Sequence, residues 1–326
     1  MNNYFFDPYL EMNKKIEKKE LRKTGNNIAL ALFIASFLSV IVSVVIVTLM
    51  TFVTGDADRA TYLLTQDLVV SNITNSLVCA LVFVFPFVFL MKLIYADNDV
   101  KSVFSAPNQK FSICAMYSLF VVLVSLGAGL VTNMVSTFFS IFTGSEPYVP
   151  SLGENYSNPV FAFGIDLVCS CVFPALVEEF AFRGVILNTL KKYGDIPAIV
   201  VSSLLFGLMH GNFVQLPYTF IMGLALGFVT VKTKSIYCAV GAHFINNFMA
   251  VLQDWFPTLG GIAVYIIIAL SIVSTIILAR RKLLTRNADY TFSYFREGTR
   301  IKYIILAPAM IVYIVLQLIS SFQFMQ

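Results

Sequence analysis

The stretch CVFPALVEEFAFRGVILNTL, residues 171–190, places two glutamates and an arginine inside an apolar segment long enough to cross a membrane. A charge at the centre of a bilayer costs about 2.5–3.5 kcal/mol on insertion scales, so Glu178, Glu179 and Arg183 need a reason to be there. The only two histidines of the chain, His210 and His243, lie in similar apolar segments downstream. Together these residues favour an enzyme.

The composition indicates an all-α transmembrane helical bundle. The chain is 58% hydrophobic and 12% charged, with a mean hydropathy of +0.81, whereas soluble domains carry about 25% charged residues. Several apolar runs reach the roughly 20 residues that cross a bilayer as a helix, and no barrel-like alternation is present. The five cysteines all fall in apolar segments without a C-x-x-C pair, which predicts free thiols rather than disulfides or a zinc knuckle.

The apolar pattern predicts a cytoplasmic N-terminal tail over residues 1–27 and a single transmembrane domain over 28–326. No signal peptide is expected, because the first apolar run is too long for one. Nine membrane helices are predicted, over residues 28–53, 68–94, 111–143, 159–190, 196–212, 215–231, 235–253, 259–279 and 303–323.

The positions of the basic residues predict a cytoplasmic N-terminus. Of the 22 lysines and arginines, only Arg59 falls on the opposite side in this nine-helix arrangement, as the positive-inside rule requires. Membrane topology therefore explains the basic clusters, and we expect contact with the bilayer and no nucleic-acid partner. Acidic residues accompany Arg59 on that side: Asp56, Asp58, Glu146 and Asp254.

Helical spacing separates the roles of the two glutamates. Glu179 and Arg183 stand at i,i+4, the spacing of an acid–base pair on one helix face. Glu178 points about 100° away and stays unpaired, which suits a general base. Pro174 loosens the backbone hydrogen bonding one turn earlier and can bend the helix towards a cavity. The alternative is a structural ion pair with a protonated glutamate that links helices.

Two further elements carry polar groups to a similar depth. They are F-x-x-x-H, which ends at His210, and H-x-x-x-N, from His243 to Asn247. At 1.5 Å per residue, Glu178, His210, His243 and Asn247 lie about 13–21 Å from the cytoplasmic helix ends. The helix before the turn HGNFVQLP is too short to cross a bilayer, so His210 is expected to face an interior cavity.

This set allows two kinds of chemistry. A carboxylate and an imidazole can activate a water for attack on a carbonyl, while a second imidazole and an amide stabilise the oxyanion. Alternatively, Glu178, His210 and His243 form a candidate zinc ligand set. No H-E-x-x-H or G-x-S-x-G motif is present, and Asp166 lies towards the far end of its helix, a poor position for a catalytic triad.

Three segments resemble the motifs of the CPBP intramembrane proteases, which include type II CAAX prenyl endopeptidases, Abi proteins and lysostaphin-resistance-like proteins. The segments are FPALVEEFAFRGVIL, FGLMHGNF and MGLALGFVTVKTKSIYCAVGAHFINN, within a core at about 159–253. The resemblance implies that Glu178 activates water with His210 as its partner. It implies that Glu179 and Arg183 shape the site, and that His243 and Asn247 stabilise the oxyanion.

The expected function is an intramembrane endopeptidase in a prokaryotic plasma membrane, acting as a glutamate protease or a metalloprotease. We expect no obligatory cofactor, with zinc as the alternative. Its substrate would be a peptide or membrane protein, either prenylated or bacteriocin-like. Two other functions remain open: a non-enzymatic immunity or peptide-binding protein, and a proton-coupled transporter, although no inverted repeat is evident.

Overall fold

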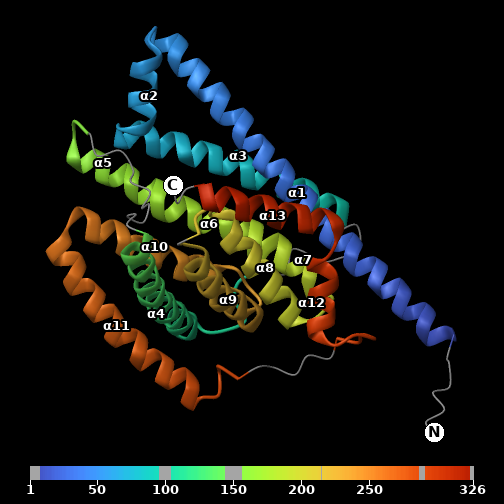
Figure 1. Cartoon of the computed structure of the whole chain (residues 1–326). Helices are drawn as coiled ribbons and strands as arrows, with labels where there is room; N and C mark the ends of the chain where they lie inside the picture. The colour runs from blue at the N-terminus through green and yellow to red at the C-terminus, as the bar shows by residue number, and fades with distance from the viewer. Residues whose placement is uncertain (1–7, 95–103, 144–155, 214, 286–290, 324–326) are drawn as a thin grey trace.

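A computed structural model describes residues 8–94, 104–143, 156–213, 215–285 and 291–323. All the regular structure in these ranges is helical, which confirms the all-α prediction (Figure 1). The helices are α1 (Pro8–Thr54), α2 (Ala57–Thr65), α3 (Leu68–Ile94), α4 (Phe111–Thr143), α5 (Pro159–Asp166), α6 (Phe173–Glu179), α7 (Asn188–Lys191), α8 (Asp195–Met209), α9 (Gln215–Thr233), α10 (Tyr237–Trp255), α11 (Pro257–Arg280), α12 (Glu297–Ile305) and α13 (Pro308–Gln323), with π-helical segments η2 (Leu167–Val172) and η3 (Phe180–Leu187).

Six helices in the described ranges are long and apolar enough to span a membrane, or seven if α12 and α13 form one span. The chain is thus a multi-pass integral membrane protein, but the predicted number of nine spans is not confirmed. α8 has only 15 residues, and α10 is long enough but too polar to meet the same criterion. The cytoplasmic N-terminus stays a prediction. Three charged residues used to predict the topology lie outside the described residues: Lys101, Glu146 and Arg286.

The predicted ninth helix is broken. α12 and α13 meet at an angle of 75°, because the residue before Pro308 is disfavoured in the α-region and Pro308 itself donates no hydrogen bond. The next free N–H, that of Ala309, donates to the Asn26 side chain of α1 at 3.0 Å. The break is therefore held in place by the first helix.

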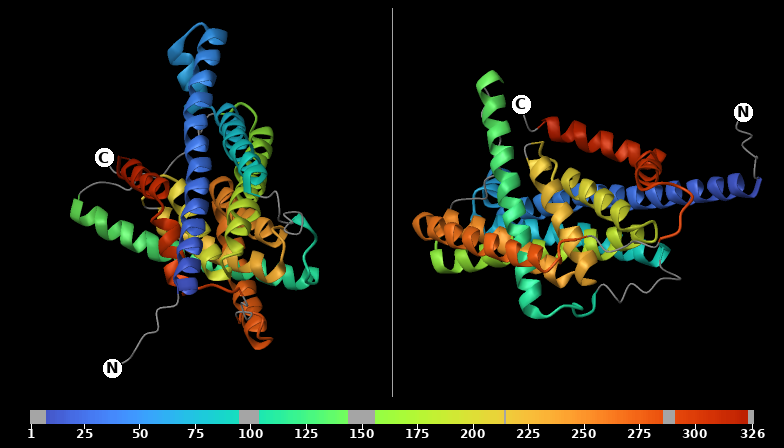
Figure 2. Two further views of the ribbon diagram at one scale, coloured as in Figure 1. Left: turned by 90° about the vertical axis from the view of Figure 1, so that its right-hand side faces the viewer. Right: turned by 90° about the horizontal axis from the view of Figure 1, so that it is seen from below.

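The apolar pattern predicts that the first helix begins near residue 28, but α1 is already helical from Pro8. Its polar part is helical because it packs on other elements: Leu21 is fully buried, and the Glu17 carboxylate accepts from the backbone N–H of Tyr294 at 2.9 Å. Figure 2 shows that the N-terminal end of α1 extends beyond the other helices. Hydropathy alone finds where an apolar segment starts, which is not where its helix starts.

The buried side chains form two clusters, and Phe228 of α9 packs against both. One cluster joins α1, α3, η3 and α8, and includes Phe182 and Phe206. The other joins α4, α9, α10 and α11, and includes Ala242. α8 packs along α9, and α4 packs on α9, α10 and α11 (Figure 1). All five cysteines are free, as predicted.

Candidate active site

The glutamates lie in a helical run over residues 159–191 that is interrupted by the two π-helical segments. Pro174 has no N–H and so cannot donate to the carbonyl of Ser170, four residues earlier. That carbonyl accepts instead from the Asn247 side-chain amide of α10 at 3.1 Å. π-Helical turns occur frequently at functional sites, and each one rotates the residues that follow it.

Glu179 and Arg183 form the ion pair that their spacing predicts. Arg183 NH1 donates to Glu179 Oε1 at 2.8 Å, and neither side chain has any exposed surface. The guanidinium also donates to the carbonyl of Gly223 in α9 at 3.3 Å and lies 4.4 Å from the centre of the Phe206 ring. These contacts compensate the loss of hydration that two buried charges would otherwise suffer.

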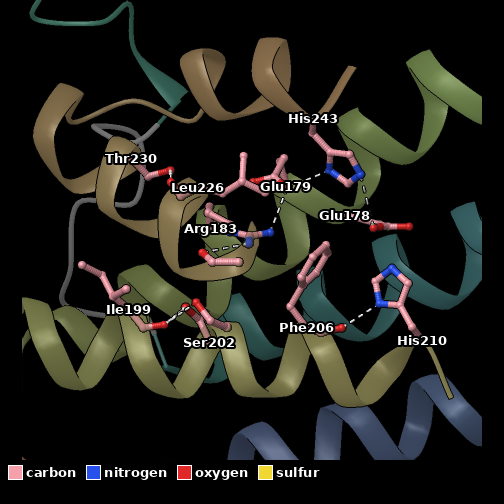
Figure 3. Close-up of polar contacts among 12 residues, drawn as sticks. Glu178, Glu179, Arg183, Ile199, Ser202, Phe206, His210, Leu226, Thr230 and His243 are labelled. Atoms are coloured by element: carbon pink, nitrogen blue, oxygen red, sulfur yellow. Dashed lines mark hydrogen bonds and ion pairs between the residues drawn. The ribbon is translucent and has the colours of Figure 1, made fainter. Parts of the chain in front are cut away.

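His243 shares the same carboxylate oxygen. Its Nδ1 lies 2.9 Å from Glu179 Oε1, and because a carboxylate only accepts, Nδ1 carries the proton. The other ring nitrogen, Nε2, lies 3.9 Å from Glu178 Oε2, which is beyond hydrogen-bonding distance. Figure 3 shows His243 between the two glutamates. Glu179 therefore fixes the orientation of the imidazole that faces Glu178.

His210 is the C-cap residue directly after α8, and Gly211 follows it with a φ of +61°, a conformation that glycine adopts readily. The His210 Nδ1 lies 2.8 Å from the Phe206 carbonyl. A carbonyl only accepts, so this nitrogen also carries the proton. Nε2 is turned towards the Glu178 carboxylate (Figure 3). The free nitrogens of both imidazoles thus face one carboxylate.

Glu178 and His210 line a cavity of about 410 Å³. Glu178 Oε2 and Glu179 Oε2 are both buried without a hydrogen-bond partner, but Glu179 Oε1 accepts from Arg183 and lies 2.9 Å from His243 Nδ1. Glu178 is therefore the unpaired carboxylate, as the spacing predicts. The other cavity residues come from α1, α3, α8 and α13, namely Leu32, Ala35, Ser36, Ser39, Asn75, Val78, Cys79, Val82, Phe83, Met209, Tyr313 and Gln317.

Asn247 contacts a neighbouring part of the site. One N–H of its amide donates to the Ser170 carbonyl at 3.1 Å, and its oxygen accepts from Asn246 at 3.3 Å. Asn246 is held in turn by the Tyr218 hydroxyl at 2.8 Å. An asparagine amide has two N–H groups, and the second N–H of Asn247 has no partner within the described part of the chain.

The metal hypothesis rests on Glu178, His210 and His243. Among the residues that the structure describes, no three His, Cys, Asp or Glu side chains form a group that could hold a metal ion. Glu178, His210 and His243 do not form such a group in this structure. The reaction proposed for this site uses protein side chains and a water molecule. The expectation that no cofactor is obligatory stays a prediction.

Sequence reasoning missed the residues that support the site from a distance. Gly223 lies in a quoted motif, but nothing local marks its carbonyl as a partner of Arg183. Cys79 and Asn75 lie on α3, outside every motif. The role of Ser170 could have been predicted from the sequence, because Pro174 leaves the Ser170 carbonyl without its usual helical donor.

The fold and site define a multi-pass membrane protein in which a free carboxylate and a histidine line a cavity, with a second histidine and a buried ion pair behind them. Residues 160–249 match the family model of type II CAAX prenyl endopeptidase Rce1-like proteins. This match confirms the resemblance of the motif-bearing core to the CPBP family.

Two curated bacterial proteins are similar to part of the chain. YdiL of Bacillus subtilis (strain 168), whose name marks it as a candidate membrane peptidase, is 27% identical over 142 residues, 40% of this chain and 58% of YdiL. The membrane-embedded CAAX protease MroQ of Staphylococcus aureus (strain USA300) is 31% identical over 103 residues, 29% of this chain and 40% of MroQ. The chain thus spans about half the length of these relatives. No solved structure gives a significant match.

Proposed function

We propose that this protein is an intramembrane endopeptidase that hydrolyses a peptide bond with a water activated by Glu178 and His210. The observation that carries the proposal is the unpaired Glu178 carboxylate at the wall of the cavity, faced by the Nε2 atoms of two imidazoles. A carboxylate that is not paired with a lysine or arginine is free to take a proton from a water. The names of the two relatives support the same class of reaction.

In the proposed reaction, a water between Glu178 and His210 gives its proton to the Glu178 carboxylate while its oxygen bonds to the peptide carbonyl carbon. The oxyanion that forms accepts from the free N–H of Asn247 and from Nε2–H of His243, which enters the reaction as the imidazolium, protonated on both ring nitrogens. The imidazolium of His243 is stabilised by Glu179, since that carboxylate already holds its Nδ1–H. Glu178 then returns the proton to the leaving nitrogen as the C–N bond breaks.

The substrate is proposed to be a peptide or a membrane protein that reaches the cavity within the bilayer. The cavity wall combines apolar side chains with a few polar ones, among them Ser36, Asn75 and Gln317. Such a surface suits an apolar peptide segment whose backbone is locally extended, because its exposed N–H and C=O groups need partners.

The test is quantitative mass spectrometry of membrane peptides from cells that produce the intact chain or Glu178→Gln. Glu20→Gln is the matched control, because it makes the same change at an exposed position of α1. We expect a defined set of cleaved peptides to be present with the intact chain and the control, and to be absent with Glu178→Gln. The same peptides in all three samples would refute the proposal and favour a peptide-binding function.

A further inference from the structure

A second buried polar cluster adjoins the site and is not used by the proposed reaction. It consists of Asn72 of α3, Asp166 of α5, Ser170 of η2 and Trp255 of α10, here called the Asp166 cluster. Asp166 is only 5% exposed. Both α3 and α10 pack on η2, so three separate parts of the bundle meet at this carboxylate (Figure 1).

The Asp166 carboxylate accepts one hydrogen bond from each of the other three residues. Oδ1 accepts from Asn72 Nδ2 at 3.1 Å and from the Ser170 hydroxyl at 2.6 Å, and Oδ2 accepts from Trp255 Nε1 at 2.8 Å. Hydrogen bonds to an ionised carboxylate are about twice as strong as neutral ones. The cluster therefore holds α3, η2 and α10 in fixed relative positions.

Ser170 links this cluster to Asn247. Its hydroxyl donates to Asp166, and its carbonyl, which Pro174 leaves without a helical donor, accepts from the Asn247 amide at 3.1 Å. Trp255 and Asn247 stand eight residues apart on α10, about two helical turns. Asp166 thus fixes the backbone turn at Ser170 that accepts from the Asn247 amide. Through Trp255 it also fixes the C-terminal end of α10, the helix that carries Asn247.

We propose that Asp166 is a positioning residue for Asn247, acting through Ser170. This inference rests on the proposed function, in which the second N–H of Asn247 stabilises the oxyanion. A displacement of a catalytic group by about 1 Å can cost about 100-fold in rate. Binding of the substrate in the ground state does not require that donor, so loss of the cluster lowers kcat and leaves KM nearly unchanged.

The experiment compares Asp166→Asn and Ser170→Ala with the intact protein, purified in detergent. Ser125→Ala is the matched control, because this fully buried serine of α4 bonds only within its own helix. The substrate is a synthetic peptide that spans a cleavage site found in the membrane-peptide comparison above. We expect kcat to fall about 10- to 100-fold for Asp166→Asn and about 3- to 10-fold for Ser170→Ala. KM should stay within about two-fold, and the control should be unaffected.

Trp255 provides a readout that needs no substrate, since it is the only tryptophan in the chain. Its indole donates to Asp166 and lies 5.1 Å from the ring of Tyr156. We expect the wavelength of maximum fluorescence of Trp255 to shift in Asp166→Asn. The asparagine amide can turn its N–H groups towards the indole N–H, which then loses its acceptor. An unchanged emission would show that this contact is absent and would overturn the inference.

A second substrate-free measurement tests the coupling itself. We expect the losses in melting temperature of Asp166→Asn and Asn247→Ala to be non-additive. The double variant should lose less than the sum of the two single losses. Additive losses, or a kcat for Ser170→Ala equal to that of the control, would refute the positioning role. If Asp166→Asn does not accumulate, Ser170→Ala decides alone. A failure of the proposed function is recognised separately, by full activity of Glu178→Gln.

Discussion

The two adjacent glutamates are predicted to respond in opposite ways to the same substitution. Glu179→Gln removes the charge from an oxygen that accepts from Arg183 at 2.8 Å and from His243 at 2.9 Å. Arg183 has no exposed surface, so its guanidinium loses the carboxylate that pairs with it directly in an apolar bundle. Glu178→Gln changes a carboxylate that has an oxygen without any hydrogen-bond partner.

The expected magnitudes differ accordingly. Breaking a buried ion pair by removing one partner costs about 3–5 kcal/mol. At about 2–4 °C per kcal/mol for a large domain, the melting temperature of Glu179→Gln should fall by about 6–20 °C. Glu178→Gln replaces an unsatisfied buried charge by a neutral amide, so its unfolding free energy should change by about 1 kcal/mol or less. Cleavage should nevertheless be abolished in Glu178→Gln.

The assay is thermal unfolding in detergent, run beside the membrane-peptide comparison. A third variant, Glu179→Gln with Arg183→Met, removes both charges and should recover part of the lost melting temperature, because the guanidinium that lost its partner is removed as well. Equal losses of stability in Glu178→Gln and Glu179→Gln would refute the division between a structural and a reactive glutamate. So would a double variant that is no more stable than Glu179→Gln.

The remaining predictions concern the histidines, one glycine and the cavity. His210→Ala should abolish cleavage with little change in melting temperature, because its side chain bonds only a carbonyl of its own helix; retained cleavage would contradict its role. His243→Ala should abolish cleavage and also lower stability by about 1.5–3 kcal/mol, the value of a hydrogen bond to a charged group, and an unchanged melting curve would argue against that bond. Gly223→Val should destabilise by about 1–3 kcal/mol in thermal unfolding, because a Cβ there lies 3.1 Å from the Ser203 Cα; a stable variant would show that α8 and α9 can separate. Cys79→Phe should lower cleavage about 10-fold or more by filling part of the 410 Å³ cavity, with the melting temperature retained, and full activity would place the substrate elsewhere.

Several features of the fold and site follow from local spacing and composition and could be predicted before the structure was known. Apolar runs predicted where α3 and α4 begin, at Leu68 and Phe111, because hydropathy and turn residues mark where a membrane helix starts. The i,i+4 spacing predicted the ion pair of Glu179 with Arg183, since residues four apart share one helix face. Glu178 could be recognised as the unpaired acid for the same reason.

Which helices bring groups to these residues could be seen only in the three-dimensional packing. His243 bonds Glu179, 64 residues away, and its Nε2 lies near Glu178, for which the sequence analysis named His210 as the partner. Asn247 turns one N–H to the Ser170 carbonyl. Both contacts depend on how far each helix is rotated about its axis, and the π-helical segments η2 and η3 change that rotation within a single helix. Rotation and crossing angle are set by the packing of whole helix faces, which no local spacing in the sequence specifies.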